Sequence, residues 1–198
     1  MSAKVLGIYG SPRKGGNSDT LLSKALEGAV SAGAEVRTVR PASLKIAGCL
    51  ECGGCDDTGV CVVKDGMGEV YPLFDWAEAI ILSGPIFFYS LPSQVKALID
   101  RAQALWARRL LSKPRSRWSD YGSGIGYLFG VGASKGANLF EGTELVAKYF
   151  FDALDMDYGG GLFFRRMEGK DDIAGSPEAL EKAFEAGRLA AGGERLTP

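Results

Sequence analysis

The residues with the most distinctive chemistry in this chain are its cysteines. All four, Cys49, Cys52, Cys55 and Cys61, lie within one stretch of 13 residues and are spaced C-x2-C-x2-C-x5-C. The surrounding segment, residues 47–64, contains four glycines and has no sustained hydrophobic period, so it predicts a loop. A glycine-rich loop can fold several thiolates around one centre. We therefore expect a metal or redox site in this segment.

The spacing of the cysteines favours one [4Fe-4S] cluster with all four thiolates as ligands. Cysteines at successive threes are typical of bacterial ferredoxin runs, in which thiolates ligate the corners of a cubane. This run differs because Val62, and not proline, follows the last cysteine. Structural zinc is an alternative, although zinc prefers two separated C-x2-C pairs. Free or disulfide-linked cysteines are a further alternative, and a reducing cytoplasm disfavours the disulfides.

A second candidate site is a loop of small and basic residues near the N-terminus. The loop, Gly10–Ser18, reads G-S-P-R-K-G-G-N-S and lies between an apolar run and a helical pattern. Backbone N–H groups at a helix N-terminus hold phosphate, and an arginine can pair with it bidentately. The loop has neither the G-x-G-x-x-G fingerprint nor the GK[ST] ending of a P-loop. We expect an anion site, the alternative being a flexible turn that binds nothing. The candidate ligands are Ser11, Arg13, Asn17 and Ser18.

Strand-like and helical segments alternate along the chain. Short apolar runs predict strands at residues 5–9, 35–39, 79–83, 127–131 and 162–164. Apolar residues at helical spacing predict helices after residue 17, over 67–76, through 95–106, over 143–154 and over 177–191. This order predicts a single α/β domain, residues 1–198, with a parallel sheet and helices on both of its faces. Ligands bind at the carboxyl ends of such strands, here residues 10–17, 84–90 and 132–138.

Composition narrows the possible function classes. The chain has no histidine, which excludes Ser-His-Asp and Cys-His hydrolases and His-ligated zinc enzymes, so we expect a cofactor to supply the chemistry. With 23 basic and 24 acidic residues the net charge is −1, which gives no broad attraction for nucleic acid or an anionic membrane. The most apolar stretch, residues 79–91, is too short to span a bilayer, and the N-terminus lacks a secretory signal. We expect a cytoplasmic protein.

Two motifs together resemble one protein family. The segment Ser83–Ser90 (S-G-P-I-F-F-Y-S), followed by Gln94–Arg101 (Q-V-K-A-L-I-D-R), is similar to a pattern of the flavodoxin-like NAD(P)H-dependent FMN reductase group. Phe87 stands where that group more often has tyrosine. The stretch Gly10–Leu21 resembles the group's G-S-P-R motif with its following Asn-Ser and leucine. The cysteine spacing resembles that of the iron-sulfur flavoprotein branch of the group. Taken alone, the aromatic run could equally be core residues at a strand end.

The resemblance implies a five-stranded parallel sheet of order 2-1-3-4-5 that binds FMN at its carboxyl edge. It implies flavin contacts from Pro85, Ile86, Phe87, Phe88, Ser134 and Gly136. It further implies an oxidoreductase that passes electrons between FMN and the cluster, as a homodimer or homotetramer. NAD(P)H or a ferredoxin-like carrier would be the donor, and a small molecule the acceptor. Two alternatives stay open: an NAD(P)H-dependent FMN or quinone reductase without a functional cluster, and a non-enzymatic redox sensor or electron shuttle.

Basic residues are concentrated between residues 101 and 117. They are Arg101, Arg108, Arg109, Lys113, Arg115 and Arg117. The simpler interpretation is a solvated helix face that also caps the helix dipole. The alternative is a docking patch for an acidic electron carrier or a nucleotide phosphate. We also expect Lys96, Asp100 and Arg101 to form an ion pair that fixes the loop before their helix.

Overall fold

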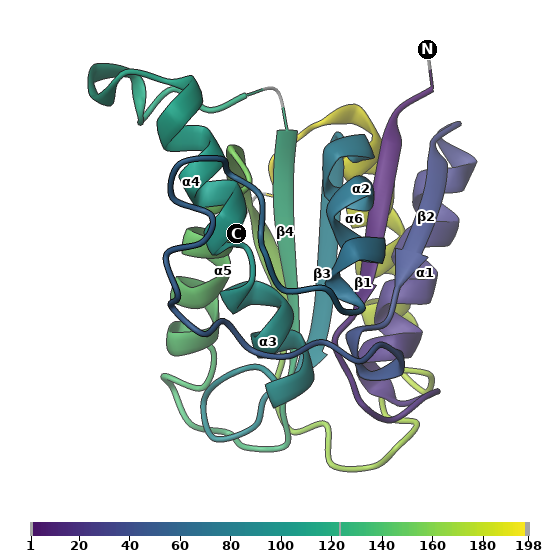
Figure 1. Cartoon of the computed structure of the whole chain (residues 1–198). Helices are drawn as coiled ribbons and strands as arrows, with labels where there is room; N and C mark the ends of the chain where they lie inside the picture. The colour runs from purple at the N-terminus through teal and green to yellow at the C-terminus, as the bar shows by residue number, and fades with distance from the viewer. Residues whose placement is uncertain (1, 123, 197–198) are drawn as a thin grey trace.

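The computed structural model describes residues 2–122 and 124–196, and a five-stranded parallel sheet forms its centre (Figure 1). The strands are β1 (Lys4–Tyr9), β2 (Glu35–Val39), β3 (Ala79–Pro85), β4 (Gly124–Val131) and β5 (Met156–Phe164). Their order in the sheet is β2-β1-β3-β4-β5, which confirms the expected topology. Because the strands are parallel, all their carboxyl ends meet at one edge of the sheet, the lower edge in Figure 1.

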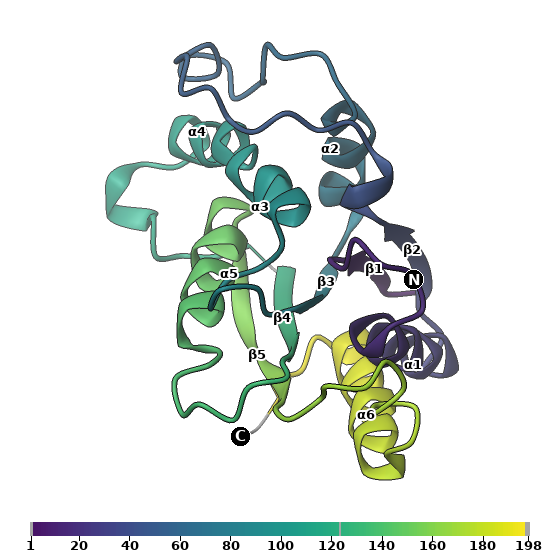
Figure 2. The same ribbon diagram turned by 90° about the horizontal axis from the view of Figure 1, so that it is seen from below.

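Helices cover both faces of the sheet. One face carries α1 (Asn17–Ser31) and α6 (Pro177–Gly192), which lie side by side (Figure 2). The other face carries α2 (Met67–Trp76), α3 (Ser93–Asp100), α4 (Gln103–Ser112) and α5 (Glu141–Ala153). Short 3-10 turns lie at Pro41–Ser43 and Arg115–Arg117. Within the described part of the chain, none of the helices has the length and apolar character needed to cross a membrane.

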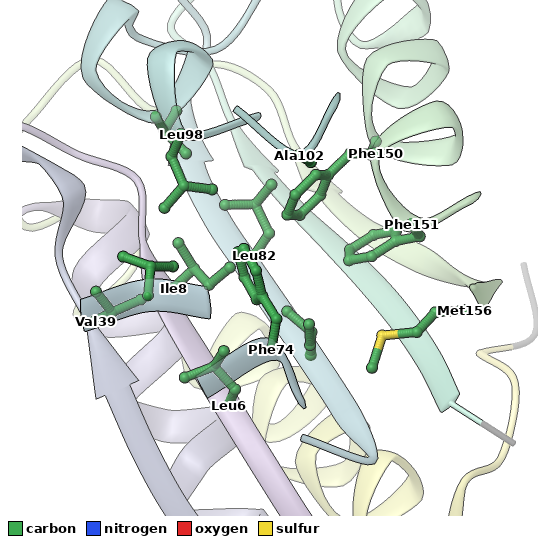
Figure 3. Packing of buried hydrophobic residues seen from close by; sticks show 14 of the residues in the cluster. Leu6, Ile8, Val39, Phe74, Leu82, Leu98, Ala102, Phe150, Phe151 and Met156 are labelled. Atoms are coloured by element: carbon green, nitrogen blue, oxygen red, sulfur yellow. The ribbon is translucent and has the colours of Figure 1, made fainter. Parts of the chain in front are cut away.

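The sheet separates two apolar cores. Successive strand residues point to opposite faces, so Val5 packs with α1 and α6, whereas Leu6 and Ile8 pack on the other side. Figure 3 shows Leu6 near Phe74 of α2, whereas Phe150 of α5 lies on the other side of Leu82. Burying side chains of this size stabilises the fold by about 1.5–3 kcal/mol each. Both faces of the sheet are therefore fixed, and only its edges and loops are free to bind ligands.

The continuous helix predicted through residues 95–106 is wrong, because a turn at residues 101–102 separates α3 from α4. The Arg101 carbonyl accepts a hydrogen bond from the Tyr71 hydroxyl at 3.0 Å. The N–H of Ala102 bonds the Ile99 carbonyl, three residues back, which tightens the chain at this point. Apolar residues keep their helical spacing through the turn, and this is why the sequence pattern does not reveal it.

The last strand is longer than the predicted segment 162–164. It pairs with β4 from Met156 onward, with a register shift between Gly126 and Leu128. Three consecutive glycines at residues 159–161 interrupt the apolar pattern and hide the first half of the strand. The final helix begins as predicted, where the Ser176 side chain caps α6 by accepting a hydrogen bond from the Ala179 N–H at 3.3 Å.

Candidate functional site

A cavity of about 320 Å³ opens at the carboxyl edge of the sheet, and we call it the edge cavity. Its lining comes from the loops that follow β1, β3, β4 and β5. Seven of the ten residues predicted to bind a cofactor line it, namely Ser11, Arg13, Asn17, Ser18, Pro85, Ile86 and Phe87. The loops are far apart in sequence, and the parallel sheet brings them together.

The first loop of the edge cavity presents the N-terminus of α1. The N-cap of this helix is Gly16, and no described side chain caps its first turn. Free N–H groups and the helix dipole favour an anion there. Ser11 shapes the loop, because its hydroxyl accepts a hydrogen bond from the Arg13 N–H at 3.1 Å. The Arg13 side chain itself is exposed at the cavity and is available to a ligand.

A buried ion pair that the sequence analysis missed supports this loop. Asp19, in the first turn of α1, accepts a hydrogen bond from the Gly15 N–H at 2.8 Å and pairs with Arg40 at 2.7 Å. Arg40 also donates to the Ser11 carbonyl at 2.9 Å. A lone carboxylate so close to an anion site would repel the ligand, and Arg40 neutralises it. Arg40 follows β2, and Asp19 lies in the helix after β1. Because β2 and β1 are neighbours in the expected strand order, that order was the signal that Arg40 and Asp19 lie close together.

Asn17 has a structural role at the edge cavity. Its Nδ2 donates to the Gly169 carbonyl at 2.7 Å, and its Oδ1 accepts from the Ile173 N–H at 3.0 Å. The side chain therefore ties the loop after β5 to the start of α1. That loop contributes Met167 and Glu168 to the cavity lining, and the sequence analysis missed both. Both residues follow the carboxyl end of β5, which was not among the three strand ends predicted to bind ligands.

The loop after β3 forms a strained hairpin at the cavity. Phe87 and Ser90 exchange two backbone hydrogen bonds of 2.8 and 3.0 Å. The two residues between them, Phe88 and Tyr89, have φ values of 50° and 61°, which are costly for side chains other than glycine. Thr143 holds the turn by donating to the Tyr89 carbonyl at 3.3 Å. Phe87 lines the cavity, whereas Phe88 is fully exposed and lies outside the lining.

The loop after β4 meets the edge cavity through Gly132 and Ala133. The predicted residues Ser134 and Gly136 lie beyond the lining, where the Ser134 hydroxyl accepts a hydrogen bond from the Gly136 N–H at 3.2 Å. Arg165 donates to the Gly136 carbonyl at 3.1 Å. The loops after β4 and β5 are therefore joined just outside the cavity.

The cysteine loop, residues 47–64, lies on the outer side of the layer formed by α2, α3 and α4 (Figure 2). It contains turns but neither helix nor strand, as predicted. Its four thiols line one cavity of about 610 Å³, which we call the cysteine cavity. Cys49 and Cys52 are exposed, and Cys55 and Cys61 are half-buried. In residues 2–122 and 124–196, no three acidic or cysteine side chains converge closely enough to hold a metal ion.

The donor set fits an iron-sulfur cluster even though the thiols are not drawn together. All four cysteines share one cavity, and thiolates are the ligands that such clusters require. Burial opposes ionisation of Cys61, but the Val63 N–H and the Arg101 guanidinium lower its pKa below the ordinary value. Burial, with a contribution from Asp56, raises the pKa of Cys55. The thiols of Cys55 and Cys61 are therefore chemically unequal before any ligand binds.

Arg101 joins the cysteine loop to the helices. Its guanidinium is buried and pairs with Asp65 at 2.7 Å. The expected ion pair is therefore only partly correct: Lys96 and Asp100 do pair, whereas Arg101 turns to the cysteine loop. The Arg101 guanidinium and the N–H groups of Ala47 and Met67 hold the pKa of Asp65 below its ordinary value, although burial acts to raise it.

The basic residues between 101 and 117 do not form a free positive patch. A solvated face is wrong for Arg101 and Arg109, which are both buried. Five of the six basic residues pair with carboxylates. The pairs are Arg101 with Asp65, Arg108 with Asp75, Arg109 with Asp152 and Asp155, Lys113 with Asp155, and Arg117 with Asp120. These pairs offset the charge that a docking patch for an acidic partner would use.

Known proteins resemble this chain in both sequence and fold. Residues 3–155 match the family described as NADPH-dependent FMN reductase. An iron-sulfur flavoprotein of Methanosarcina thermophila is 36% identical over 132 residues, which cover 67% of this chain and 64% of that protein. An iron-sulfur flavoprotein of Methanocaldococcus jannaschii is 38% identical over 163 residues, which cover 81% of this chain and 77% of that protein.

The fold comparison agrees with the sequence comparison. A solved flavone reductase superposes with a TM-score of 0.70 at 20% identity, covering 96% of this chain and 62% of that one, which shows a shared fold. The chain spans 64% of the length of the Methanosarcina relative, a little under two thirds. The matched family, the relatives and the sheet order together show that the chain belongs to the NADPH-dependent FMN reductase family, in its iron-sulfur flavoprotein branch.

Proposed function

We propose that this protein is a flavin-dependent oxidoreductase that passes electrons between FMN at the edge cavity and a [4Fe-4S] cluster in the cysteine cavity. One observation carries the proposal: in a chain of an FMN reductase family, all four cysteines line a single cavity that is separate from the edge cavity. No histidine is needed, because the two cofactors supply the redox chemistry.

The edge cavity would hold FMN through groups of different chemistry at its two sides. The N–H groups at the start of α1, with Arg13, suit the phosphate, and the hydroxyls of Ser11 and Ser18 lie at the same side. Pro85, Ile86 and Phe87 offer an apolar wall for the ring. The strained hairpin fixes the position of that wall. FMN, when bound, supplies one- and two-electron chemistry, and the protein binds and orients it.

The cysteine cavity would hold the cluster through Cys49, Cys52, Cys55 and Cys61. A bound cluster supplies one-electron transfer. The lowered pKa of Cys61 helps to form the thiolate, which is the form that ligates iron. NAD(P)H or a ferredoxin-like carrier would be the donor and a small molecule the acceptor, in a homodimer or homotetramer.

Anaerobic purification tests this proposal directly. We expect about four iron and four sulfide ions per FMN, with visible absorption from both cofactors. Replacement of all four cysteines by serine should remove the iron and sulfide and leave the flavin in place. Flavin without iron, in a wild-type preparation reconstituted anaerobically with iron and sulfide, would overturn the cluster assignment.

An NAD(P)H-dependent FMN or quinone reductase without a functional cluster is the second candidate. The spread of the thiols favours it, since Cys49 and Cys52 are exposed and the described residues bring no three ligands together. This candidate predicts that the variant with four serines is reduced by NADPH as fast as the wild type. The electron-transfer proposal predicts instead that this variant loses reduction by a one-electron carrier. Stopped-flow flavin bleaching with each donor separates the two.

A further inference from the structure

We infer that Arg101 is a positioning residue for the cysteine loop, which it closes at both ends while leaving its Nε–H for a sulfur ligand of the cluster. The inference rests on the proposed cluster, because the Nε–H has no acceptor among residues 2–122 and 124–196. Arg101 lines the cysteine cavity, and its side chain is 1% exposed. A buried guanidinium is costly unless its donors are used, so each of its contacts has to be explained.

One side chain joins the two ends of the cysteine loop. At the start of the loop, Arg101 Nη1 donates to the Ala47 carbonyl at 3.0 Å. At its end, Nη2 donates to the Val63 carbonyl at 3.2 Å, and Nη1 pairs with Asp65 at 2.7 Å. Asp65 in turn accepts the Ala47 N–H at 2.9 Å. The guanidinium and the carboxylate therefore close the loop beside one backbone hydrogen bond, which runs from the Gly66 N–H to the Lys45 carbonyl at 2.9 Å. This closure lowers the entropy cost that a ligand must overcome.

The position of Arg101 in the fold makes this closure rigid. The residue lies in the turn between α3 and α4, where its carbonyl accepts the Tyr71 hydroxyl at 3.0 Å. Ala102, the next residue, is buried in the core on that face of the sheet. Backbone and side chain are therefore both fixed, so the guanidinium is preorganised toward the loop.

The loop also rests on α4 at its middle. Gly59 has a φ of +67°, and a Cβ atom on it would lie 2.4 Å from the Cβ of Arg108. This approach permits only glycine. The loop is thus held at its two ends and at one central point. Cys49, Cys52 and Cys55 lie on one arc between these points, and Cys61 lies on the other.

The Nε–H of Arg101 is the donor that we assign to the ligand. Its Nε atom is buried and has no hydrogen-bond partner among the described residues. Leaving such a group unpaired costs about 1–3 kcal/mol, so a missing acceptor is the physical explanation. Arg101 and Cys61 line the same cavity. A thiolate or an inorganic sulfide in that cavity is an anionic acceptor of the right kind, and the guanidinium charge would offset the negative charge of the cluster.

Two substitutions of Arg101 distinguish its hydrogen bonds to the loop from the effect of its positive charge on the cluster. Arg101→Gln removes the charge and the fork of donors, whereas Arg101→Lys keeps only the charge. Arg109→Lys is the matched control. Arg109, on α4, is buried and paired with carboxylates as Arg101 is, but it does not line the cysteine cavity. Bound FMN and the thermal unfolding midpoint report whether each variant is folded.

Cluster-free protein gives a readout that does not depend on the cluster. A protease that cuts after Glu51, which lies within the cysteine loop, should cut both Arg101 variants several-fold faster than the wild type and the Arg109 control. With the cluster bound, we expect its retention against an iron chelator to fall about tenfold or more in Arg101→Gln. Its reduction potential should fall in Arg101→Gln and stay near the wild-type value in Arg101→Lys, because a nearby positive charge stabilises the reduced cluster.

The outcomes distinguish this inference from the proposed function. Wild-type protein that takes up no iron or sulfide would overturn the cluster and the role of Nε, and the protease rates would still decide whether Arg101 closes the loop. A folded Arg101→Gln variant with wild-type cutting, chelator resistance and potential would overturn the inference while the cluster stands. The reduction potential and the retention of the cluster could also be the same in Arg101→Lys as in Arg101→Gln. The positive charge would then have no role, and that part of the inference would be wrong.

Discussion

The edge cavity is closed by contacts between loops that are distant in sequence, whereas the cysteine cavity is formed mainly by one continuous loop. At the edge cavity, Asn17 ties α1 to the loop after β5, and Arg40 joins the first loop to Asp19. At the cysteine cavity, the exposed loop is held chiefly by Arg101 and Asp65. Figure 1 shows the loops after β1, β3, β4 and β5 at the carboxyl edge of the sheet, and the cysteine loop running outside the helices.

The two cavities differ in whether the site is formed before its cofactor binds. The edge cavity uses hydrogen bonds that exist before a ligand arrives, so the ligand enters a shape that is already formed. The cysteine loop leaves its thiols apart, so ligand binding must complete its order, as in metal sites whose assembly is coupled to folding. Substitutions at the edge should therefore change both stability and flavin affinity. Substitutions of the thiols should change cluster content and little else.

The largest expected effect is the loss of the cluster from Cys55→Ser. Cys55 is half-buried at the cysteine cavity, and all four thiols are needed because the chain has no fifth cysteine. Iron and sulfide should fall to background, while FMN content stays at the wild-type level. The free energy of unfolding of the cluster-free protein should change by less than about 0.5 kcal/mol. Asp57→Ser, an exposed change in the same loop, is the control. Loss of FMN together with iron would show that the two regions are not independent.

The second effect tests the edge cavity through Arg40→Leu. This change leaves Asp19 unpaired at the start of α1 and removes the bond to the Ser11 carbonyl. Repulsion between Asp19 and the FMN phosphate should cost about 2 kcal/mol, or about 30-fold in Kd. Fluorescence titration of FMN into the apoprotein measures it. Arg37→Leu, which removes an exposed arginine from β2, just before Arg40 in the chain, should leave the affinity unchanged.

A second variant isolates the repulsion itself. Adding Asp19→Asn to Arg40→Leu removes the unpaired carboxylate and should restore most of the FMN affinity. If the double variant binds FMN as weakly as Arg40→Leu, then Arg40 acts by shaping the loop, and charge compensation is the wrong explanation.

Local pattern was enough to predict a parallel sheet and the loops that contribute most of the edge cavity's lining, whereas the strand order came from the family resemblance. Buried strands are short apolar runs, and each ends in a turn motif such as Gly10-Ser11-Pro12 or Gly84-Pro85. The turn between α3 and α4 was missed for a physical reason. Its apolar residues keep helical spacing, and the feature that marks it is a bond from Tyr71 in another helix.

The contacts that support the two sites were not predicted, because they join segments that are distant in the sequence. Arg40 reaches Asp19 only because β2 lies beside β1, and Arg101 reaches Asp65 only because the loop folds back over α3. The sequence shows these residues as ordinary charges. Met167 was a different kind of miss, since the rule that ligands gather at strand ends applies to β5 as it does to the other strands.

The third effect, that of Asn17→Ala, tests whether the loop after β5 is part of the preformed edge. The change leaves the Ile173 N–H and the Gly169 carbonyl without their partner. We expect the free energy of unfolding to fall by about 1–2 kcal/mol. FMN should also dissociate several-fold faster, because Met167 lies on the loop that is released. Chemical unfolding and stopped-flow fluorescence measure the two quantities.

The conservative variant Asn17→Asp is the control for this contact. It keeps an oxygen that can accept the Ile173 N–H but cannot donate to the Gly169 carbonyl, so its stability should fall between those of the wild type and Asn17→Ala. A loss of stability in Asn17→Ala with an unchanged rate of FMN release would show that the loop after β5 does not retain the flavin.

The smallest effect concerns acid stability of the cysteine loop. The pKa of Asp65 is lowered from 3.8, since Arg101 and two backbone N–H groups favour the carboxylate more than burial opposes it. A lowered pKa in the folded state adds stability that is fully present above the ordinary pKa and is lost as the pH falls through the folded value. The cluster-free wild type should therefore lose stability below about pH 4, and Asp65→Asn should lose less over the same range. Urea unfolding followed by tryptophan fluorescence measures this difference. Equal pH slopes in the two proteins would mean that Asp65 does not contribute to holding the loop, and that Arg101 closes it through the carbonyl groups alone.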